Sequence, residues 1–293
     1  MGRDLARDFP SARRTFEEVD DQLGMALSRL CFEGPGETLE LTEYAQPALL
    51  ACSVAAYRVA RESSAFEPVV MAGHSLGEWS ALVAAGALSL GDAARGVRER
   101  GRLMQEAVPV GTGAMAAVMG LEASVVEALC VDAAGGEVLA AANLNGAGQV
   151  VVAGHRGAVE RLVGLARARR AKAQLLAVSA PFHCALMTPA AEGLAPFLAT
   201  VDLRLPATPV CTSVEGRLVT GTDDIRSLLA CQLTAPVRWD ATMEVLGKAP
   251  ARLAVEFGVG RALSGLWKRT VSAIPVLPVG EPGGVAALRE GLA

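Results

Sequence analysis

The chain has 293 residues, and its 27 lysines and arginines against 31 aspartates and glutamates give a formal net charge of −4. This balance argues against a protein that binds nucleic acid through bulk electrostatics. A hydrophobic content of 52% beside 20% charged residues excludes an intrinsically disordered chain. The longest uncharged run, residues 173–191, is interrupted by two prolines and a histidine, so we expect no membrane-spanning helix.

Six cysteines are scattered along the sequence without a Cys-x-x-Cys pair. This spacing is typical of reduced thiols and not of a disulfide framework or a zinc site. The first residues alternate charged and apolar side chains and show no secretory pattern. We therefore expect a cytoplasmic enzyme of mixed α/β type that holds no metal.

The first third of the chain is predicted to consist of helices that lead into a buried strand. Helical patterns cover residues 5–30 and 45–60, and the apolar run 68–72 is typical of a buried strand. Residues 76–87 again have helical composition. A strand, a tight turn and a helix in this order indicate a parallel α/β sheet.

The middle third has a different order of elements. It contains four strand patterns and two helical patterns. In chain order they are a strand at 114–119, a helix at 122–134, strands at 138–143 and 149–153, a helix at 156–170 and a strand at 174–178. This order is that of a ferredoxin-like fold.

The last third returns to the α/β pattern, with strands expected at 209–212 and 253–257 and helices at 225–233 and 261–269. We therefore predict two domains. A large α/β-hydrolase-like domain with a parallel sheet comprises residues 1–110 and 181–293, and a ferredoxin-like subdomain comprises the inserted residues 111–180.

The sequence Gly73-His74-Ser75-Leu76-Gly77 lies between an expected strand and an expected helix. In that setting Gly-x-Ser-x-Gly predicts a nucleophile elbow, in which the serine sits at a sharp, strained turn. Ser75 is then the candidate nucleophile, and the backbone N–H of Leu76 is the candidate donor to an oxyanion. The alternative is a plain glycine-rich turn, because the motif alone is weak in a chain with 31 glycines.

A serine nucleophile needs a base, and the chain has three histidines. His74 adjoins Ser75, where successive side chains point apart, so we expect it to support the turn and to line the substrate site. His155 begins a basic helix and is expected at the surface. His183 lies where the small subdomain returns to the main sheet, and a seam between domains is a usual place for a site. Elimination makes His183 the candidate base, with a packed loop histidine as the alternative.

The helix expected around residues 93–104 carries an arginine on its inward side. Ala93, Val97 and Met104 define the apolar face, and Arg100 lies about 60° from the centre of that face. A guanidinium keeps its charge in proteins, so an inward arginine needs a carboxylate partner. Two partners remain open: a carboxylate of the protein, in a structural ion pair, or a carboxylate of a ligand.

Six blocks of sequence occur together in a characteristic order. They are residues 73–78 (GHSLGE), 100–105 (RGRLMQ), 182–187 (FHCALM), Gln232 with 236–239 (PVRW), 256–258 (EFG) and 263–269 (LSGLWKR). Together these blocks resemble the malonyl-CoA:acyl-carrier-protein transacylases, a family that includes the acyltransferase units of polyketide synthases. The likeness extends from the first residue to about Arg269.

The resemblance implies that Ser75 is acylated, that His183 is the general base and that Arg100 holds the malonyl carboxylate. It also implies that the main-chain carbonyl of Gln232 orients the histidine in place of an acidic side chain. Phe182 is similar to the residue of malonyl-selecting members and would crowd an α-methyl group.

The implied reaction is a ping-pong transfer of malonyl from malonyl-CoA to the serine, and then to the phosphopantetheine thiol of an acyl carrier protein. It serves fatty-acid or polyketide synthesis and needs no cofactor. We expect no nucleic-acid or membrane partner. A run of basic residues is expected either to help dock the acidic carrier protein or to form a solvated helix face. It comprises Arg156, Arg161, Arg167, Arg169, Arg170 and Lys172.

One part of the family pattern has no counterpart in this sequence. The family begins with a strand that ends in a Gly-Gln-Gly-x-Gln turn, which supplies one of the two oxyanion donors. The resemblance therefore implies an open sheet edge and a loss of about 3 kcal/mol of transition-state stabilisation. Three alternatives stay open: a trans-acting polyketide acyltransferase of other acyl specificity, a serine acyl-hydrolase, which would not need Arg100, and an inactive truncated interaction module.

Overall fold

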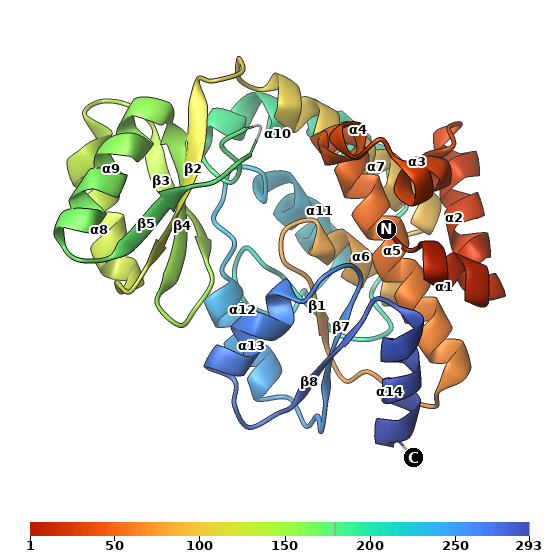
Figure 1. Cartoon of the computed structure of the whole chain (residues 1–293). Helices are drawn as coiled ribbons and strands as arrows, with labels where there is room; N and C mark the ends of the chain where they lie inside the picture. Colours follow the sequence, from red (N-terminus) through yellow and green to blue (C-terminus); the bar gives the residue numbers. More distant parts are fainter. Residues whose placement is uncertain (179, 293) are drawn as a thin grey trace.

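A sheet of antiparallel strands forms one lobe of the computed structural model, which describes residues 1–178 and 180–292 (Figure 1). In the described chain its strand order is β3-β4-β2-β5. The strands are β2 (Gly113–Met119), β3 (Leu139–Leu144), β4 (Gln149–His155) and β5 (Lys172–Leu175), and the helices α8 (Ala123–Ala134) and α9 (Arg156–Ala168) connect them. This order confirms the predicted ferredoxin-like topology.

The two faces of the four-stranded sheet pack against different parts of the molecule. Along β2, Ala116 and Val118 face a core that includes residues of α8 and α9. Met115 and Ala117 point to the opposite face, where the core includes Cys184 and is contacted by Phe182. Because successive side chains of a strand alternate between faces, burial on both sides explains the unbroken apolar run of β2. The second face places the segment around His183 against the sheet.

The small lobe is joined to the rest of the chain by backbone hydrogen bonds at its β3 edge. The N–H of Leu144 donates to the carbonyl of Val237 at 2.8 Å, and the N–H of Val237 donates to the carbonyl of Ala142 at 2.8 Å. The β5 strand begins two residues earlier than predicted. The domain boundaries at residues 110/111 and 180/181 remain predictions. Residues 179 and 293 lie outside the described residues.

The larger lobe contains two pairs of parallel strands. β1 (Met71–Ala72) pairs with β6 (Val210–Cys211), and β7 (Ala254–Phe257) pairs with β8 (Val276–Val279). The parallel sheet predicted here is thus present as two short ladders, and the strand expected at 68–72 is reduced to two residues. A cavity of about 510 Å³ is lined by β1 and β7 and by the side chains of Tyr57 and Trp239.

Helices surround these strand pairs (Figure 1). They are α1 (Arg3–Asp8), α2 (Pro10–Leu23), α3 (Leu27–Glu33), α4 (Gly36–Glu40), α5 (Thr42–Ser63), α6 (Gly77–Ala84), α7 (Leu90–Glu106), α10 (Thr188–Thr200), α11 (Thr222–Cys231), α12 (Trp239–Gly247), α13 (Ala262–Thr270) and α14 (Pro282–Leu292), with a 3₁₀ turn at Ala185–Met187. The helical pattern expected over 5–30 is divided in the structure among α1, α2 and α3. Pro10 starts a new helix, since proline is tolerated at the first helical position, and Gly24 ends it in a left-handed conformation.

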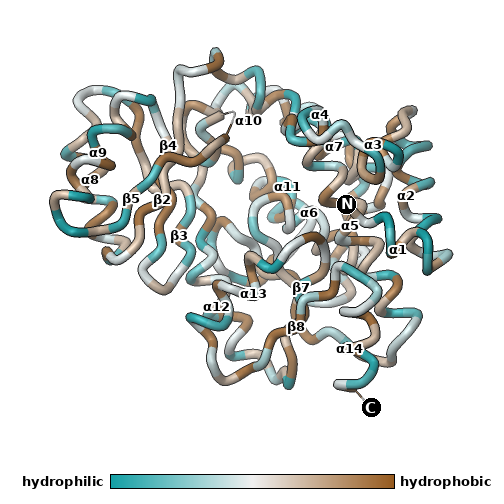
Figure 2. Tube along the Cα trace, in the orientation of Figure 1, coloured by the Kyte–Doolittle hydropathy of each residue, from teal (hydrophilic) through white to brown (hydrophobic). Residues whose placement is uncertain are grey.

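The core of the larger lobe is built from small side chains. On α5, Ala48, Ala51 and Ala55 are fully buried, and α5 packs along α7. Close packing extends to Gly96 of α7, where a Cβ atom would lie 2.5 Å from the Trp79 ring. In the same lobe, hydrophobic residues mark the strand β8 in Figure 2. Within the described residues, no helix combines the length and the apolar character needed to span a bilayer.

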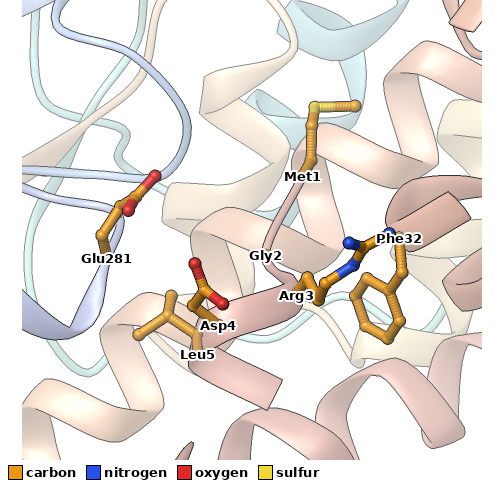
Figure 3. Close-up of a pocket in the computed structure, with 8 residues that line it drawn as sticks. Met1, Gly2, Arg3, Asp4, Leu5, Phe32 and Glu281 are labelled. Atoms are coloured by element: carbon orange, nitrogen blue, oxygen red, sulfur yellow. The ribbon is translucent and has the colours of Figure 1, made fainter. Parts of the chain in front are cut away.

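A second cavity, of about 280 Å³, lies beside the first helix (Figure 3). Its lining includes Asp4 of α1, Phe32 of α3 and Glu281, which precedes α14. The lining residues are distinct from every candidate site residue named above, so this cavity plays no part in the site described next.

Candidate active site

The candidate nucleophile occupies a sharp turn between β1 and α6. Ser75 has φ +52°, in the left-handed region that L-residues seldom adopt. A Cβ atom on Gly73 would lie 1.9 Å from the carbonyl carbon of Gly77, whereas a Cβ on Gly77 would meet nothing within 4 Å. The first glycine therefore permits the close crossing of the turn, and the predicted elbow geometry is present. Leu76 precedes the first turn of α6, and its N–H makes no hydrogen bond within the described chain.

His183 lies within hydrogen-bond distance of the candidate nucleophile. Its Nε2 is 2.8 Å from Ser75 Oγ, and its Nδ1 is 2.8 Å from the main-chain carbonyl oxygen of Gln232. Because a carbonyl oxygen can only accept, Nδ1 carries the proton and Nε2 is left to accept the serine hydroxyl proton. The carbonyl thus takes the place of an acidic residue, as the resemblance implies.

The environment keeps the His183 ring neutral. The side chain is 4% exposed. Burial, together with the nearby positive charge of Arg100, lowers the pKa of His183 to about 3, although the hydrogen bond to Gln232 opposes this shift. A neutral imidazole at physiological pH can act as a general base. The geometry thus favours a basic histidine over one that is merely packed in a loop.

Arg100 reaches the same point from α7. It is 2% exposed. Its Nη2 donates to Ser75 Oγ at 3.0 Å and to Gln232 Oε1 at 3.0 Å, and its Nη1 donates to Gln46 Oε1 at 2.6 Å. Burial lowers the pKa of Arg100 to about 10, so the group stays charged at neutral pH.

The partners of this guanidinium bear on the two possibilities left open by the sequence. Among the described residues no carboxylate forms an ion pair with Arg100, and its buried Nε has no hydrogen-bond partner. The structural ion pair is therefore not found. The cation is held by neutral amide and hydroxyl groups, and a ligand carboxylate as its partner remains a prediction.

The other two histidines have structural partners. His74 Nε2 is 3.0 Å from Asn145 Oδ1, and its ring lies against Trp239 with centroids 5.6 Å apart. This contact ties the elbow to the small lobe, as expected of a residue that supports the turn; a contact with substrate remains a prediction. His155 Nδ1 accepts the backbone N–H of Val138 at 3.0 Å, which makes it a local strand contact.

Phe182 directly precedes His183 and is partly buried between the cores of the two lobes. Its role in selecting the acyl group remains a prediction. Two further residues of the site, Gln46 and Asn145, were not identified from the sequence. The one signal in the sequence was a polar residue within a largely apolar segment, and the structure shows that both side chains are buried.

Comparison with known proteins decides the family. The model of the acyl transferase domain matches residues 1–256. This chain belongs to the acyl transferase family. The acyl transferase is 45% identical over 291 residues to the malonyl CoA-acyl carrier protein transacylase of Escherichia coli K12, covering 99% of this chain and 94% of that relative.

Solved structures show the same likeness over the whole acyl transferase. One is the malonyl CoA-acyl carrier protein transacylase of Coxiella burnetii, with a TM-score of 0.97 and 39% identity, covering 100% of this chain and 93% of the other. Another is a malonyl-transacylase in complex with a type II polyketide acyl-carrier protein, with a TM-score of 0.96 and 43% identity, covering 99% and 94%. These matches support the fold predicted from the sequence, a large α/β-hydrolase-like domain with a ferredoxin-like subdomain.

Proposed function

We propose that this acyl transferase moves a malonyl group from malonyl-CoA to Ser75, and from there to the phosphopantetheine thiol of an acyl carrier protein. The observation that carries the proposal is the buried Arg100, which lies 3.0 Å from the nucleophilic oxygen and has no carboxylate partner among the described residues. Relatives that match almost the full chain are named malonyl CoA-acyl carrier protein transacylases, and this supports the choice of acyl group and acceptor.

In the first half-reaction, His183 Nε2 takes the proton of Ser75 as Oγ attacks the thioester carbonyl of malonyl-CoA. The negative charge that forms on the carbonyl oxygen is stabilised by the N–H of Leu76 at the N-terminus of α6. The C–S bond then breaks, the serine ester forms, and the departing CoA sulfur takes the proton from Nε2.

In the second half-reaction, the carrier-protein thiol gives its proton to His183 Nε2 as its sulfur attacks the malonyl ester. The C–O bond to Ser75 breaks, and Oγ recovers the proton from Nε2. The carbonyl of Gln232 holds the imidazole in the same tautomer in both halves, because it accepts from Nδ1. His183 therefore accepts a proton and gives it up again in each half-reaction.

Arg100 selects for an acyl group with a terminal carboxylate. In a malonyl ester the carboxylate carbon is three covalent bonds from Oγ, and Nη2 already lies beside Oγ. The unpartnered Nε and this Nη2 belong to one edge of the guanidinium, which suits a bidentate contact. An acetyl group has no charge to place there and leaves the free Nε donor without an acceptor.

Part of the basic run in the small lobe is available to a carrier protein. Arg156 donates to the carbonyl of Gly111, Arg161 to the carbonyls of Ala133 and Ala134, and Arg167 to the carbonyl of Ala173. These three arginines serve the fold. The remaining exposed basic group comprises Arg169, Arg170 and Lys172. We infer that this group steers an acidic carrier protein.

The six cysteines of the described chain are free, and all but Cys231 are buried. Thiols in this state fit a reducing compartment. We therefore place the reaction in the cytoplasm.

Mass spectrometry of the intact protein tests the function. After mixing with malonyl-CoA, the wild-type chain should gain the mass of one malonyl group, and Ser75→Ala should gain none. His183→Ala should load at least about 100-fold more slowly, as expected for loss of a general base. A wild-type chain that folds and never forms the adduct would sink the transferase proposal and favour a non-catalytic module. Release of free malonate at the rate of CoA release would favour the acyl-hydrolase.

A further inference from the structure

A buried carboxylate beside the site has no part in the mechanism above. Glu78 lies in the first turn of α6 and is 2% exposed. Its Oε2 accepts the backbone N–H of Ser213 at 3.1 Å, the hydroxyl of Ser213 at 2.7 Å and the Nε2 of Gln232 at 2.8 Å. Among the described residues it forms no direct ion pair. Burial raises the pKa of the Glu78 carboxyl above its ordinary value, and the hydrogen bonds from Ser213 and Gln232 act in the opposite direction.

The side-chain amide of Gln232 connects this carboxylate to Arg100. Gln232 is fully buried; its Oε1 accepts from Arg100 Nη2 at 3.0 Å while its Nε2 donates to Glu78. A guanidinium can only donate and an ionised carboxylate can only accept. One orientation of the amide satisfies both neighbours, and a flipped amide would set donor against donor at Arg100 and acceptor against acceptor at Glu78.

This arrangement supplies a counter-charge without blocking the arginine. The negative charge of Glu78 raises the pKa of Arg100, against the lowering effect of burial. The amide contacts Nη2, and among the described residues the Nε of Arg100 has no hydrogen-bond partner. A carboxylate in direct contact with the guanidinium would compete with the substrate for the same donors.

We propose that Glu78 is a positioning residue for acyl selection, which acts through the Gln232 amide to aim Arg100 at the carboxylate of the acyl group. The same glutamine holds His183 through its main-chain carbonyl, so the network joins the recognition of the acyl group to the base. This inference rests on the proposed function, since it assumes that malonyl is the group transferred.

The experiment compares serine loading from malonyl-CoA and from acetyl-CoA in Glu78→Gln, Glu78→Asp and the wild type. Glu78→Gln keeps the size of the side chain but removes the charge and one of the two contacts that fix the orientation of the Gln232 amide. We expect the ratio of kcat/KM for malonyl over acetyl to fall at least about tenfold, a change of about 1.4 kcal/mol. Glu78→Asp keeps the charge and should lose less.

Glu256→Gln is the matched control. Its carboxylate also accepts two N–H groups, those of Leu263 and Ser264, but it caps α13 and has no contact with Arg100. It should leave the ratio unchanged. In an Arg100→Ala background, Glu78→Gln should have no further effect on the ratio, because residues that act through one another are not additive.

Three results would overturn the positioning role. The first is a malonyl-to-acetyl ratio in folded Glu78→Gln that lies within about twofold of the wild-type ratio. The second is a further fall of this ratio when Glu78→Gln is added to Arg100→Ala. The third is failure of both Glu78 variants to fold, which would assign the carboxylate to stability alone. The wild-type measurement separates this inference from the proposed function. Absence of wild-type loading removes both, whereas normal loading with an unchanged ratio removes the positioning role alone.

Discussion

Replacement of Arg100 by alanine should convert a malonyl-selective site into one that no longer distinguishes malonyl from acetyl. The guanidinium is 2% exposed and borders the nucleophile at 3.0 Å, so its contact with a substrate carboxylate would be almost fully desolvated. Truncating one partner of a buried, hydrogen-bonded charge pair costs about 2–5 kcal/mol. At about 1.4 kcal/mol per tenfold, kcat/KM for malonyl loading should fall by roughly 30-fold to 4000-fold.

The assay measures Ser75 loading from malonyl-CoA and from acetyl-CoA by intact mass, with thermal unfolding as a check on the fold. Acetyl loading should change by less than about tenfold, since that acyl group loses no ion pair. Arg100→Lys should fall between the wild type and Arg100→Ala, because lysine keeps the charge but lacks the planar fork. If malonyl and acetyl loading fell in parallel in a folded variant, Arg100 would be a structural residue and the assignment would be refuted.

Further predictions concern His183, Gly73, Phe182 and the exposed basic group. The pKa of His183 is lowered to about 3, so loading at pH 5.5 should stay within about twofold of its rate at pH 7.5, whereas a histidine with an ordinary pKa would give a roughly tenfold loss. Below about pH 6.5 the unfolded chain binds a proton on His183 and the folded chain does not. His183 should therefore lower the free energy of unfolding as pH falls from 6.5 towards 3. Denaturation measured across this pH range tests the prediction. Gly73→Ala should lower the free energy of unfolding by about 3 kcal/mol, because its Cβ would overlap the backbone of Gly77. Gly77→Ala is the control, because its Cβ enters open space. Equal losses of stability for the two variants in urea denaturation would contradict the close approach at Gly73. Phe182→Ser should raise loading from methylmalonyl-CoA relative to malonyl-CoA by about tenfold, the value of one methyl group in a pocket; an unchanged ratio would remove this residue from acyl selection. Reversal of the exposed basic group to glutamate should slow transfer to the carrier protein at low salt and leave serine loading intact; unaltered transfer would show that the group is merely solvated.

Much of the candidate site was predictable because its signals are local. The Gly-x-Ser-x-Gly spacing between an apolar strand and a helix indicated Ser75 and Leu76, and the structure shows the sharp turn at φ +52°. Helical periodicity placed Arg100 toward the interior, where it is 2% exposed. His183 followed from elimination among three histidines, and its contact with Ser75 agrees with that choice.

Other features could not be predicted because they depend on contacts between distant segments. Gln46 meets Arg100 across 54 positions of sequence, and Asn145 meets His74 across 71. The sequence offered two possible partners for the arginine, and the choice required knowledge of which carboxylates the fold brings near it. The helical pattern over 5–30 did not show where one helix ends and the next begins, and the structure places these breaks near Pro10 and Gly24.

Composition, periodicity and turn chemistry by themselves determined the class of fold, the order of elements in the small lobe and the identity of the candidate nucleophile, since each depends on residues within about one element of one another. The tertiary structure decided which charges are paired. It placed Glu78 one amide away from Arg100 and not against it, and no pattern along the chain encodes that separation. The physical reason is that burial and hydrogen-bond partners, which set the charge state and reactivity of a group, arise when segments more than a hundred residues apart pack into one site.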